Sequence, residues 1–135
     1  MKLLIAIPAR YAAKRFPGKP LAKILGKTML QRVYTIALTA ANKYQDIECI
    51  VATEDHRILD FCKANNMQCV LTSEQCKTGT DRIQELIATL KIKPEFIINL
   101  QGDNPLCPPW VVTAIIAAYQ ANPMLEIVTP AIQLT

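Results

Sequence analysis

The sequence predicts an α/β domain in which a mostly parallel sheet is covered by helices on both faces. Strand-like and helix-like segments alternate along nearly the whole chain. The strand-like runs are continuously apolar, which is typical of parallel strands buried on both faces. The length of 135 residues, with 51% hydrophobic and 19% charged residues, fits one globular domain. We therefore expect a single α/β domain over residues 1–135.

The predicted elements of the first half follow one another closely. The apolar run 3–7 predicts the first strand, and apolar spacings of three and four residues predict a helix over 28–42 with Thr28 as its N-cap. A second strand is expected at 48–52, and a helix from about 55 to 65.

The second half continues the same alternation. A short strand is expected at 68–71, a helix at 80–90 and a strand at 96–100. A helix at 110–121 and a last strand at 126–129 complete the pattern. The predicted sheet is thus truncated after about five strands, and its last strand would be a bare edge.

Composition and charge exclude several classes of protein. The net charge is +4, and six of the fifteen cationic residues lie within 2–23, which favours a small anionic ligand over nucleic acid. The five cysteines form no CxxC pair and there is one histidine, so a zinc site is not expected, and reduced thiols are. No apolar run has the length of a signal peptide or a membrane span, so we expect a cytoplasmic protein that does not contact the membrane.

The loop after the first strand carries the clearest functional signal. Residues 8–20 hold four cations, Arg10, Lys14, Arg15 and Lys19, among three prolines and a glycine. Cations crowded at the carboxyl end of a buried strand repel one another, and a polyphosphate would relieve that repulsion. The alternative is a solvated basic loop.

Polar residues follow the other predicted strands in the same way. Thr53 follows the second strand, the segment Thr78-Gly79-Thr80-Asp81-Arg82 leads into a helix, and Gln101 and Asp103 follow the fourth strand. A helix start can bind a phosphate, and Asp103 beside a glycine suits a hard cation such as Mg²⁺. Because the carboxyl ends of parallel strands meet at one edge, we expect these residues to converge.

Each of these residues also has a purely structural interpretation. Asp103 could cap the following turn, Thr80 could be only the N-cap of its helix, and Thr53 belongs to a segment, 53–55, that could be mostly a cap. The chain has no phosphate-binding GxxxxGK[ST] loop, no GxGxxG fingerprint and no GxSxG nucleophile elbow. The functional interpretation therefore depends on all of the residues taken together.

Four segments resemble motifs of the sugar-acid cytidylyltransferases, and most closely those of the 3-deoxy-manno-octulosonate (Kdo) cytidylyltransferases. Residues 7–21 are similar to I-P-A-R-x-x-S-x-R-x-P-G-K-P-L, and 51–55 to the V-A-T-D segment. Residues 78–82 are similar to S-G-T-[DE]-R, and 99–105 to N-x-Q-G-D-E-P. Two positions depart from the family pattern: Ala13 replaces the usual Ser or Thr, and Asn104 replaces Glu, which removes one carboxylate beside Asp103.

The resemblance implies a nucleotide-diphospho-sugar transferase (Rossmann-like) fold and a reaction in which CMP passes from CTP to Kdo, with release of pyrophosphate, for lipopolysaccharide biosynthesis. By resemblance, the catalytic residues that hold the CTP phosphates are Arg10, Arg15 and Lys19, and Asp103 binds Mg²⁺. The nucleotide-binding residues so implied are Pro8, Ala9, Arg10, Arg15, Lys19, Thr53, Thr78, Gly79, Thr80, Arg82 and Gln101.

Family members are longer, so the resemblance implies that this chain carries only the CTP-binding half. Most of the Kdo pocket, a second metal-binding aspartate and the usual dimer contacts would lie in the other half. Three interpretations stay open: an enzyme, acting as a homodimer or with a complementing C-terminal chain; a non-catalytic CTP-binding module; and a truncated, inactive gene product.

Overall fold

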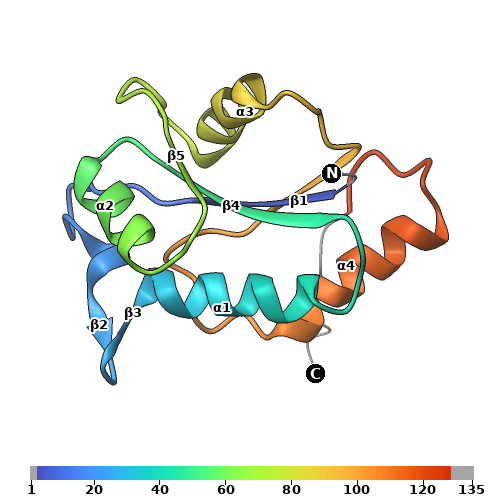
Figure 1. The fold of residues 1–135 in the computed structure, drawn as a ribbon, viewed down its shortest axis with the longest axis horizontal. Coiled ribbons are helices and arrows are strands. Elements are labelled where there is room, and N and C mark those ends of the chain that lie inside the picture. Colours follow the sequence, from blue (N-terminus) through green and yellow to red (C-terminus); the bar gives the residue numbers. More distant parts are fainter. Residues whose placement is uncertain (1–2, 129–135) are drawn as a thin grey trace.

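The centre of the fold is a parallel sheet of four strands in the order β5-β4-β1-β6, seen in a computed structural model that describes residues 3–128 (Figure 1). The strands are β1 (Leu3–Pro8), β4 (Ile47–Thr53), β5 (Cys69–Leu71) and β6 (Phe96–Asn99). Strand β1 pairs with β4 on one side and with β6 on the other. The first four predicted strands are therefore confirmed, each within one or two residues of its expected bounds.

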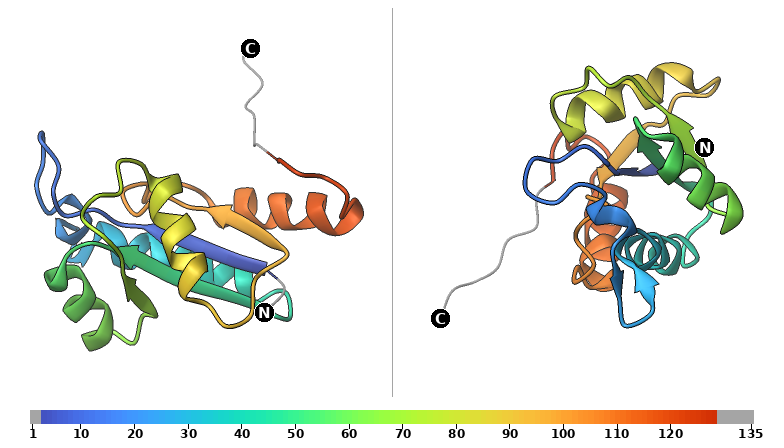
Figure 2. Two further views of the ribbon diagram at one scale, coloured as in Figure 1. Left: turned by 90° about the horizontal axis from the view of Figure 1, so that it is seen from above. Right: turned by 90° about the vertical axis from the view of Figure 1, so that its left-hand side faces the viewer.

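Helices cover both faces of this sheet, as predicted. Helices α1 (Met29–Ala41), α2 (His56–Ala64) and α4 (Pro109–Ala121) pack on one face. Helix α3 (Gly79–Thr89) lies alone on the other face (Figures 1 and 2). All four predicted helices are thus present.

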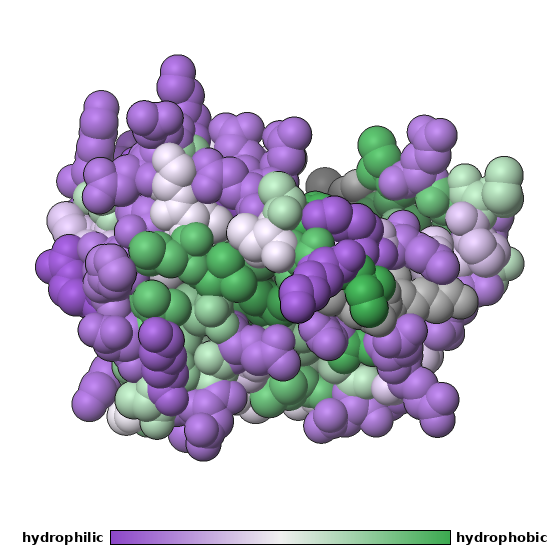
Figure 3. Space-filling view, turned by 45° about the horizontal axis from the view of Figure 1, so that its top comes forward, coloured by the Kyte–Doolittle hydropathy of each residue, from purple (hydrophilic) through white to green (hydrophobic). Residues whose placement is uncertain are grey.

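The alternation of side chains along β1 divides the core into two parts. Leu3, Ile5 and Ile7 belong to the large apolar cluster under α1, whereas Leu4 and Ala6 point to the smaller cluster under α3. This is why the strand had to be apolar at every position. With the α3 side turned towards the viewer, hydrophilic side chains surround an apolar patch (Figure 3).

The helix starts are fixed by side-chain caps. Thr28 caps α1 in a capping box with Gln31, as expected, and Asp55 caps α2 by accepting from the Arg57 N–H at 2.8 Å. Helix α3 is capped by Thr78, also in a capping box. The alternative that Thr80 caps this helix is therefore wrong.

The segment between the basic loop and α1 contains elements that the sequence did not predict. A 3₁₀ turn at Lys19–Leu21 is followed by a hairpin of β2 (Lys23–Ile24) and β3 (Lys27–Thr28). The two hairpin-loop residues, Leu25 and Gly26, have positive φ angles of 52° and 85°. A two-residue turn with positive φ at both positions normally carries Asn-Gly or Asp-Gly. Leu25 takes the place of the Asn or Asp, so the sequence did not indicate a hairpin here.

The predicted strand at 126–129 is wrong for residues 126–128, and Thr129 lies outside the described residues. A bend occurs at Glu126, and no strand forms over the following two residues. Ile127 is 82% exposed, so its side chain makes little packing contact that would offset the entropy cost of ordering this segment. The described sheet accordingly ends at β6.

Two further findings bear on the kind of protein. Across residues 3–128, no helix combines the length and the apolar character needed to cross a membrane. All five cysteines are free, and three of them are buried, in agreement with the expected reduced thiols.

Candidate functional site

The sheet order creates a crevice at the carboxyl ends of β1 and β6. From β1 the chain crosses by α1 to β4 on one side, whereas α3 leads from β5 to β6 on the other side of β1. Ligands of open α/β sheets bind where the strand order reverses in this way. The loops that follow β1 and β6 therefore lie at the expected place for a site.

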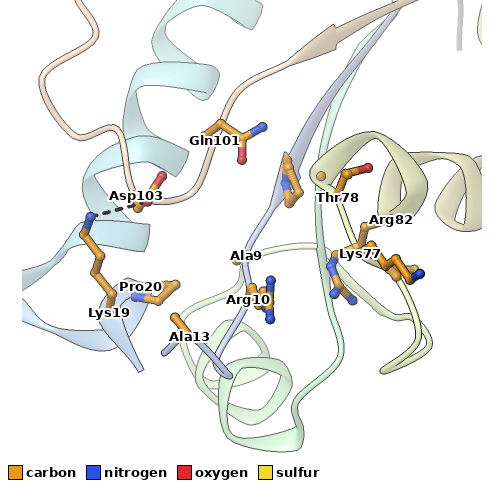
Figure 4. Close-up of a pocket in the computed structure, with 13 residues that line it drawn as sticks. Ala9, Arg10, Ala13, Lys19, Pro20, Lys77, Thr78, Arg82, Gln101 and Asp103 are labelled. Carbon is orange, nitrogen blue, oxygen red and sulfur yellow. Dashed lines mark hydrogen bonds and ion pairs between the residues drawn. The ribbon is translucent and has the colours of Figure 1, made fainter. Parts of the chain in front are cut away.

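A pocket of about 240 Å³ lies in this crevice, between the loop after β1, the start of α3 and the loop after β6 (Figure 4). Nine of the twelve predicted site residues line it. They are Pro8, Ala9, Arg10, Lys19, Thr78, Gly79, Arg82, Gln101 and Asp103. The predicted convergence is confirmed for the loop after β1, the start of α3 and the loop after β6, whereas Thr53, at the end of β4, does not line the pocket.

Two glycines allow the walls of the pocket to come close together. A Cβ on Gly79 would lie 2.9 Å from the Gln101 amide nitrogen and 3.2 Å from the Pro8 ring. A Cβ on Gly102 would lie 3.1 Å from both the Ala9 Cβ and the Pro8 carbonyl oxygen. A side chain at Gly79 would displace the exposed Gln101 amide, and one at Gly102 would need a shift of a few tenths of an ångström in the loop after β1, so glycine suits both positions.

The basic loop after β1 is held from outside the pocket by β4 and α2. The Glu54 carboxylate accepts from the backbone N–H groups of Tyr11 at 2.8 Å and Ala12 at 3.3 Å. The Gly18 N–H donates to the Tyr11 carbonyl at 2.8 Å and closes the loop. The Arg57 guanidinium lies 3.4 Å from the centre of the Tyr11 ring. Sequence reasoning missed Tyr11 and assigned Glu54 only to a cap.

Arg82 is a buried cation in the wall of the pocket, and it is 2% exposed. Its Nη1 donates to the Thr72 hydroxyl at 2.6 Å and to the Ser73 carbonyl at 3.2 Å. These two bonds compensate for part of the cost of burying the guanidinium charge. Arg82 therefore joins the loop after β5 to α3 while its side chain still lines the pocket.

The start of α3 contributes backbone donors to the pocket. Because the Thr78 hydroxyl already accepts from the Asp81 N–H at 3.1 Å, it is engaged in the cap. Gly79 begins the helix and lines the pocket. The first N–H groups of a helix have no partner within the helix and attract anions.

Lys19 and Asp103 connect the loops after β1 and β6. The Lys19 Nζ lies 3.4 Å from the Asp103 Oδ2 in a partly exposed ion pair, which Figure 4 marks with a dashed line. No group of three His, Cys, Asp or Glu side chains that could hold a metal ion occurs within the described part of the chain. Asp103 thus fits a Mg²⁺ ion only where phosphate oxygens supply most of the other ligands, which is how Mg²⁺ commonly binds beside nucleotides.

Three predicted residues lie outside the lining of this pocket. Arg15 and Thr80 are exposed, and neither lines the pocket. Thr53 is 0% exposed, and its hydroxyl accepts from the Asp55 N–H at 3.3 Å. A direct contact between these three residues and a nucleotide stays a prediction.

Four residues that line the pocket were not predicted. They are Ala13, Pro20, Cys76 and Lys77. Burial and the nearby Glu85 carboxylate raise the pKa of the Cys76 thiol, whose Sγ lies 3.2 Å from the Glu85 Oε1. Lys77 and Cys76 directly precede the TGTDR segment, and Ala13 and Pro20 lie inside the basic loop, so adjacency to the motifs was the available signal.

The charges of the pocket favour a polyanion. Arg10, Lys19, Lys77 and Arg82 line it, and Asp103 is its single carboxylate. Arginine and lysine side chains together with the N-terminus of a helix are the groups that proteins use for phosphates. The exposed amide of Gln101 provides a donor and an acceptor on the same wall.

Comparison with known proteins finds one family and relatives of one name. The sequence model of a family described as Cytidylyltransferase matches residues 4–135. The chain is 42% identical over 134 residues to a 3-deoxy-manno-octulosonate cytidylyltransferase of Maricaulis maris, covering 99% of this chain and 51% of that protein. It is 46% identical to the protein of the same name from Protochlamydia amoebophila, covering 91% of this chain and 47% of that protein.

A solved structure agrees with the sequence relatives. It is a CMP:2-keto-3-deoxy-manno-octonic acid synthetase complexed with CTP, which matches with a TM-score of 0.84 and 38% identity. The match covers 93% of this chain and 50% of that chain. The present chain thus spans about half the length of the relatives that it matches.

Proposed function

The chain belongs to the cytidylyltransferase family, and from that membership we propose that it binds CTP together with Mg²⁺ in the pocket between β1, α3 and β6. We further propose that it is the CTP-binding half of an enzyme that transfers CMP from CTP to Kdo and releases pyrophosphate. The relatives named above as Kdo cytidylyltransferases support this choice of sugar acid.

One observation carries the proposal. Four cations surround one small cavity at the switch point of the sheet: Arg10 and Lys19 from the loop after β1, and Lys77 and Arg82 from the start of α3. Among common ligands, a triphosphate supplies enough negative charge at close range to balance them. The match to a CTP-complexed structure points to cytidine as the nucleoside.

The residues would act mainly by positioning and by stabilising charge. The anomeric hydroxyl oxygen of Kdo would form a bond to the α-phosphorus of CTP as the bond to the β-phosphate oxygen breaks. The hydroxyl proton passes to solvent or a base, and pyrophosphate leaves. Arg10 and Lys19 would stabilise the charge that develops on the leaving group, and Arg82 and the start of α3 would hold the phosphate chain in place.

Asp103 is the residue that would hold Mg²⁺, with phosphate oxygens as the other ligands. The ion would neutralise part of the negative charge of the phosphates. An ion bound by the Asp103 carboxylate would compete with Lys19 for its charge, which would leave Lys19 more available to a phosphate.

Three finer points belong to the same proposal. The product would serve lipopolysaccharide biosynthesis, and the protein would act in the cytoplasm, where CTP is made. The partner that completes the Kdo pocket would be a second copy of the chain or a complementing C-terminal chain.

A second candidate function is favoured by the length of the match. The chain spans about half of its relatives, and by the resemblance to the family most of the Kdo pocket would lie in the other half. Correct placement of two reactants contributes orders of magnitude to a rate, so a chain without that half would turn over slowly. A CTP-binding module without catalysis of its own is the alternative.

Two measurements on the same protein distinguish these functions. Calorimetry with CTP and Mg²⁺ measures binding, and a pyrophosphate-release assay with CTP, Mg²⁺ and Kdo measures turnover. Binding with turnover that is lost in Asp103→Ala supports the enzyme, and binding without turnover supports the module. The absence of binding would contradict both.

A further inference from the structure

The loop that carries the phosphate-binding cations is fixed by groups that themselves lie outside the pocket. We propose that Glu54, acting through Tyr11, is a positioning residue that sets the β1 loop for a triphosphate before the nucleotide arrives. This inference rests on the proposed function, because it concerns how the same pocket binds CTP. Neither Glu54 nor Tyr11 lines the cavity.

The hydrogen bonds of Glu54 reach the loop at its first turn. The carboxylate, at the end of β4, accepts from the backbone N–H groups of Tyr11 and Ala12, directly after Arg10. The Thr53 hydroxyl lies 3.4 Å from the Glu54 Oε1 and contributes a further donor. Hydrogen bonds to a charged acceptor are about twice as strong as neutral ones. The backbone on the carboxyl side of Arg10 is therefore anchored to the sheet.

Tyr11 transmits this anchoring to the far end of the loop. Its carbonyl accepts from the Gly18 N–H, and its ring fills the space where a Gly18 Cβ would lie, at 2.9 Å. The Arg57 guanidinium also packs on the Tyr11 ring, and a 2.8 Å ion pair with Asp55 holds Arg57 in place. Lys19 directly follows Gly18, so one residue fixes the backbone beside both Arg10 and Lys19.

The physical reason for such an arrangement is the repulsion among the cations of the loop. Residues 10–19 contain four cations, and without a ligand they favour an open loop. Glu54 places a negative charge beside them and binds two backbone donors. Setting the loop in advance removes the ordering cost from nucleotide binding, and this raises the affinity.

The effect should be selective for the triphosphate. CMP lacks the two phosphates that Arg10 and Lys19 are proposed to neutralise, so its binding depends less on the loop. A residue with a purely structural role would weaken the binding of CTP and CMP alike.

The test compares CTP and CMP binding by calorimetry in Mg²⁺ for four proteins. These are the wild type, Glu54→Ala, Arg57→Ala and the control Glu48→Ala, which removes an exposed carboxylate from the opposite end of the same strand. We expect Glu54→Ala to weaken CTP binding about tenfold or more and CMP binding less than about twofold, from the loss of two charge-assisted bonds. Arg57 is exposed, so Arg57→Ala leaves the fold intact and should weaken CTP binding about threefold.

Amide hydrogen exchange without nucleotide gives an independent measurement. In Glu54→Ala, the Tyr11 and Ala12 amides should exchange faster, whereas core amides of β1 should not change. Equal CTP affinity of the wild type and Glu54→Ala, or equal losses for CTP and CMP, would overturn the positioning role. A wild type that does not bind CTP would overturn the proposed function and this inference with it, so the two failures are distinguishable.

Discussion

The loops after β1 and β6 face each other across the pocket, but they are held in opposite ways. The β1 loop is anchored to β4 by the Glu54 carboxylate and closed by the Gly18–Tyr11 hydrogen bond. The β6 loop is exposed at Asp103 and Asn104. It is joined to the β1 side of the pocket by the hydrogen bond from the Gly102 N–H to the Pro8 carbonyl and by the ion pair of Asp103 with Lys19. Leu106, in the same loop, is 88% exposed.

This contrast suggests different roles for the two loops. The side that would bind phosphates is formed in advance, and the side that would bind the metal is left adjustable. A fixed phosphate site lowers the ordering cost of binding, whereas an exposed carboxylate can adjust its position to a metal ion that arrives with the nucleotide. The following variants test each side separately.

The largest effect is expected for Arg10→Ala. Arg10 lines the pocket and is exposed, so its loss should remove the charged contacts that we propose it makes to the phosphates and should leave the fold intact. We expect CTP binding to weaken about 10- to 100-fold, since a hydrogen bond to a charged group contributes about 1.5–3 kcal/mol. Calorimetry with Lys43→Ala, an exposed cation just beyond α1, provides the control. Equal affinities of the two variants would contradict a phosphate site at the β1 loop.

The next effect tests the anchoring of the same loop by comparing two glycines. Gly18 and Gly26 have positive φ angles of 72° and 85°, so alanine at either position should cost about 1–2 kcal/mol of folding free energy in backbone strain. A Cβ on Gly18 would also lie 2.9 Å from the Tyr11 ring, whereas one on Gly26 meets nothing within 4 Å.

Gly18→Ala should therefore unfold at lower denaturant concentration than Gly26→Ala and should also bind CTP more weakly. Urea unfolding followed by calorimetry measures both quantities. If Gly26→Ala weakened CTP binding as much as Gly18→Ala, the Tyr11 contact would have no role in the site.

A smaller effect is expected on the adjustable side. Asp103→Asn removes the charge that we propose binds Mg²⁺, together with an exposed ion pair that contributes at most about 1 kcal/mol to stability. CTP affinity measured without Mg²⁺ should stay the same or rise, because Lys19 is released, and the gain in affinity on adding Mg²⁺ should disappear. A Mg²⁺ effect as large as that of the wild type would exclude Asp103 as the metal ligand.

The smallest effect concerns Cys76 in the pocket wall. Because burial and Glu85 raise the pKa of this thiol, it holds less thiolate at pH 7.5 than a free cysteine. Its alkylation by iodoacetamide should be a few times slower than that of free cysteine and slower again with CTP bound. Mass spectrometry with Cys76→Ser as the reference checks the site of modification. Faster alkylation in the presence of CTP would contradict the location of the pocket.

Much of the fold could be predicted because short segments of the sequence specify their own secondary structure. The continuous apolar run of β1 and the spacing in α1 define elements without reference to the rest of the molecule. The hairpin at 23–28 could not be predicted, because leucine takes a positive φ where glycine or asparagine is usual. The apolar run near Ile127 was misassigned, since a strand also needs a paired neighbour.

The candidate site was predictable for a different reason. Parallel strands bring their carboxyl ends together, so Arg10, Gly79 and Gln101 were expected to meet before any geometry was known. The support from Glu54 and Tyr11 was not predictable, because a hydrogen bond from the backbone of one loop to a carboxylate side chain 43 residues away leaves no pattern in the sequence. The burial of Thr53 likewise became apparent only from its packing.

The most direct test is a CTP titration of the isotope-labelled chain in Mg²⁺, followed by the backbone amide signals in NMR spectra. If the pocket is the CTP site, the largest shifts will occur at Ala9, Arg10, Gly79 and Gly102, and the hairpin loop at Leu25 and Gly26 will not shift. Saturable shifts confined to another surface, or no shifts at all, would contradict a CTP site at the carboxyl ends of β1 and β6.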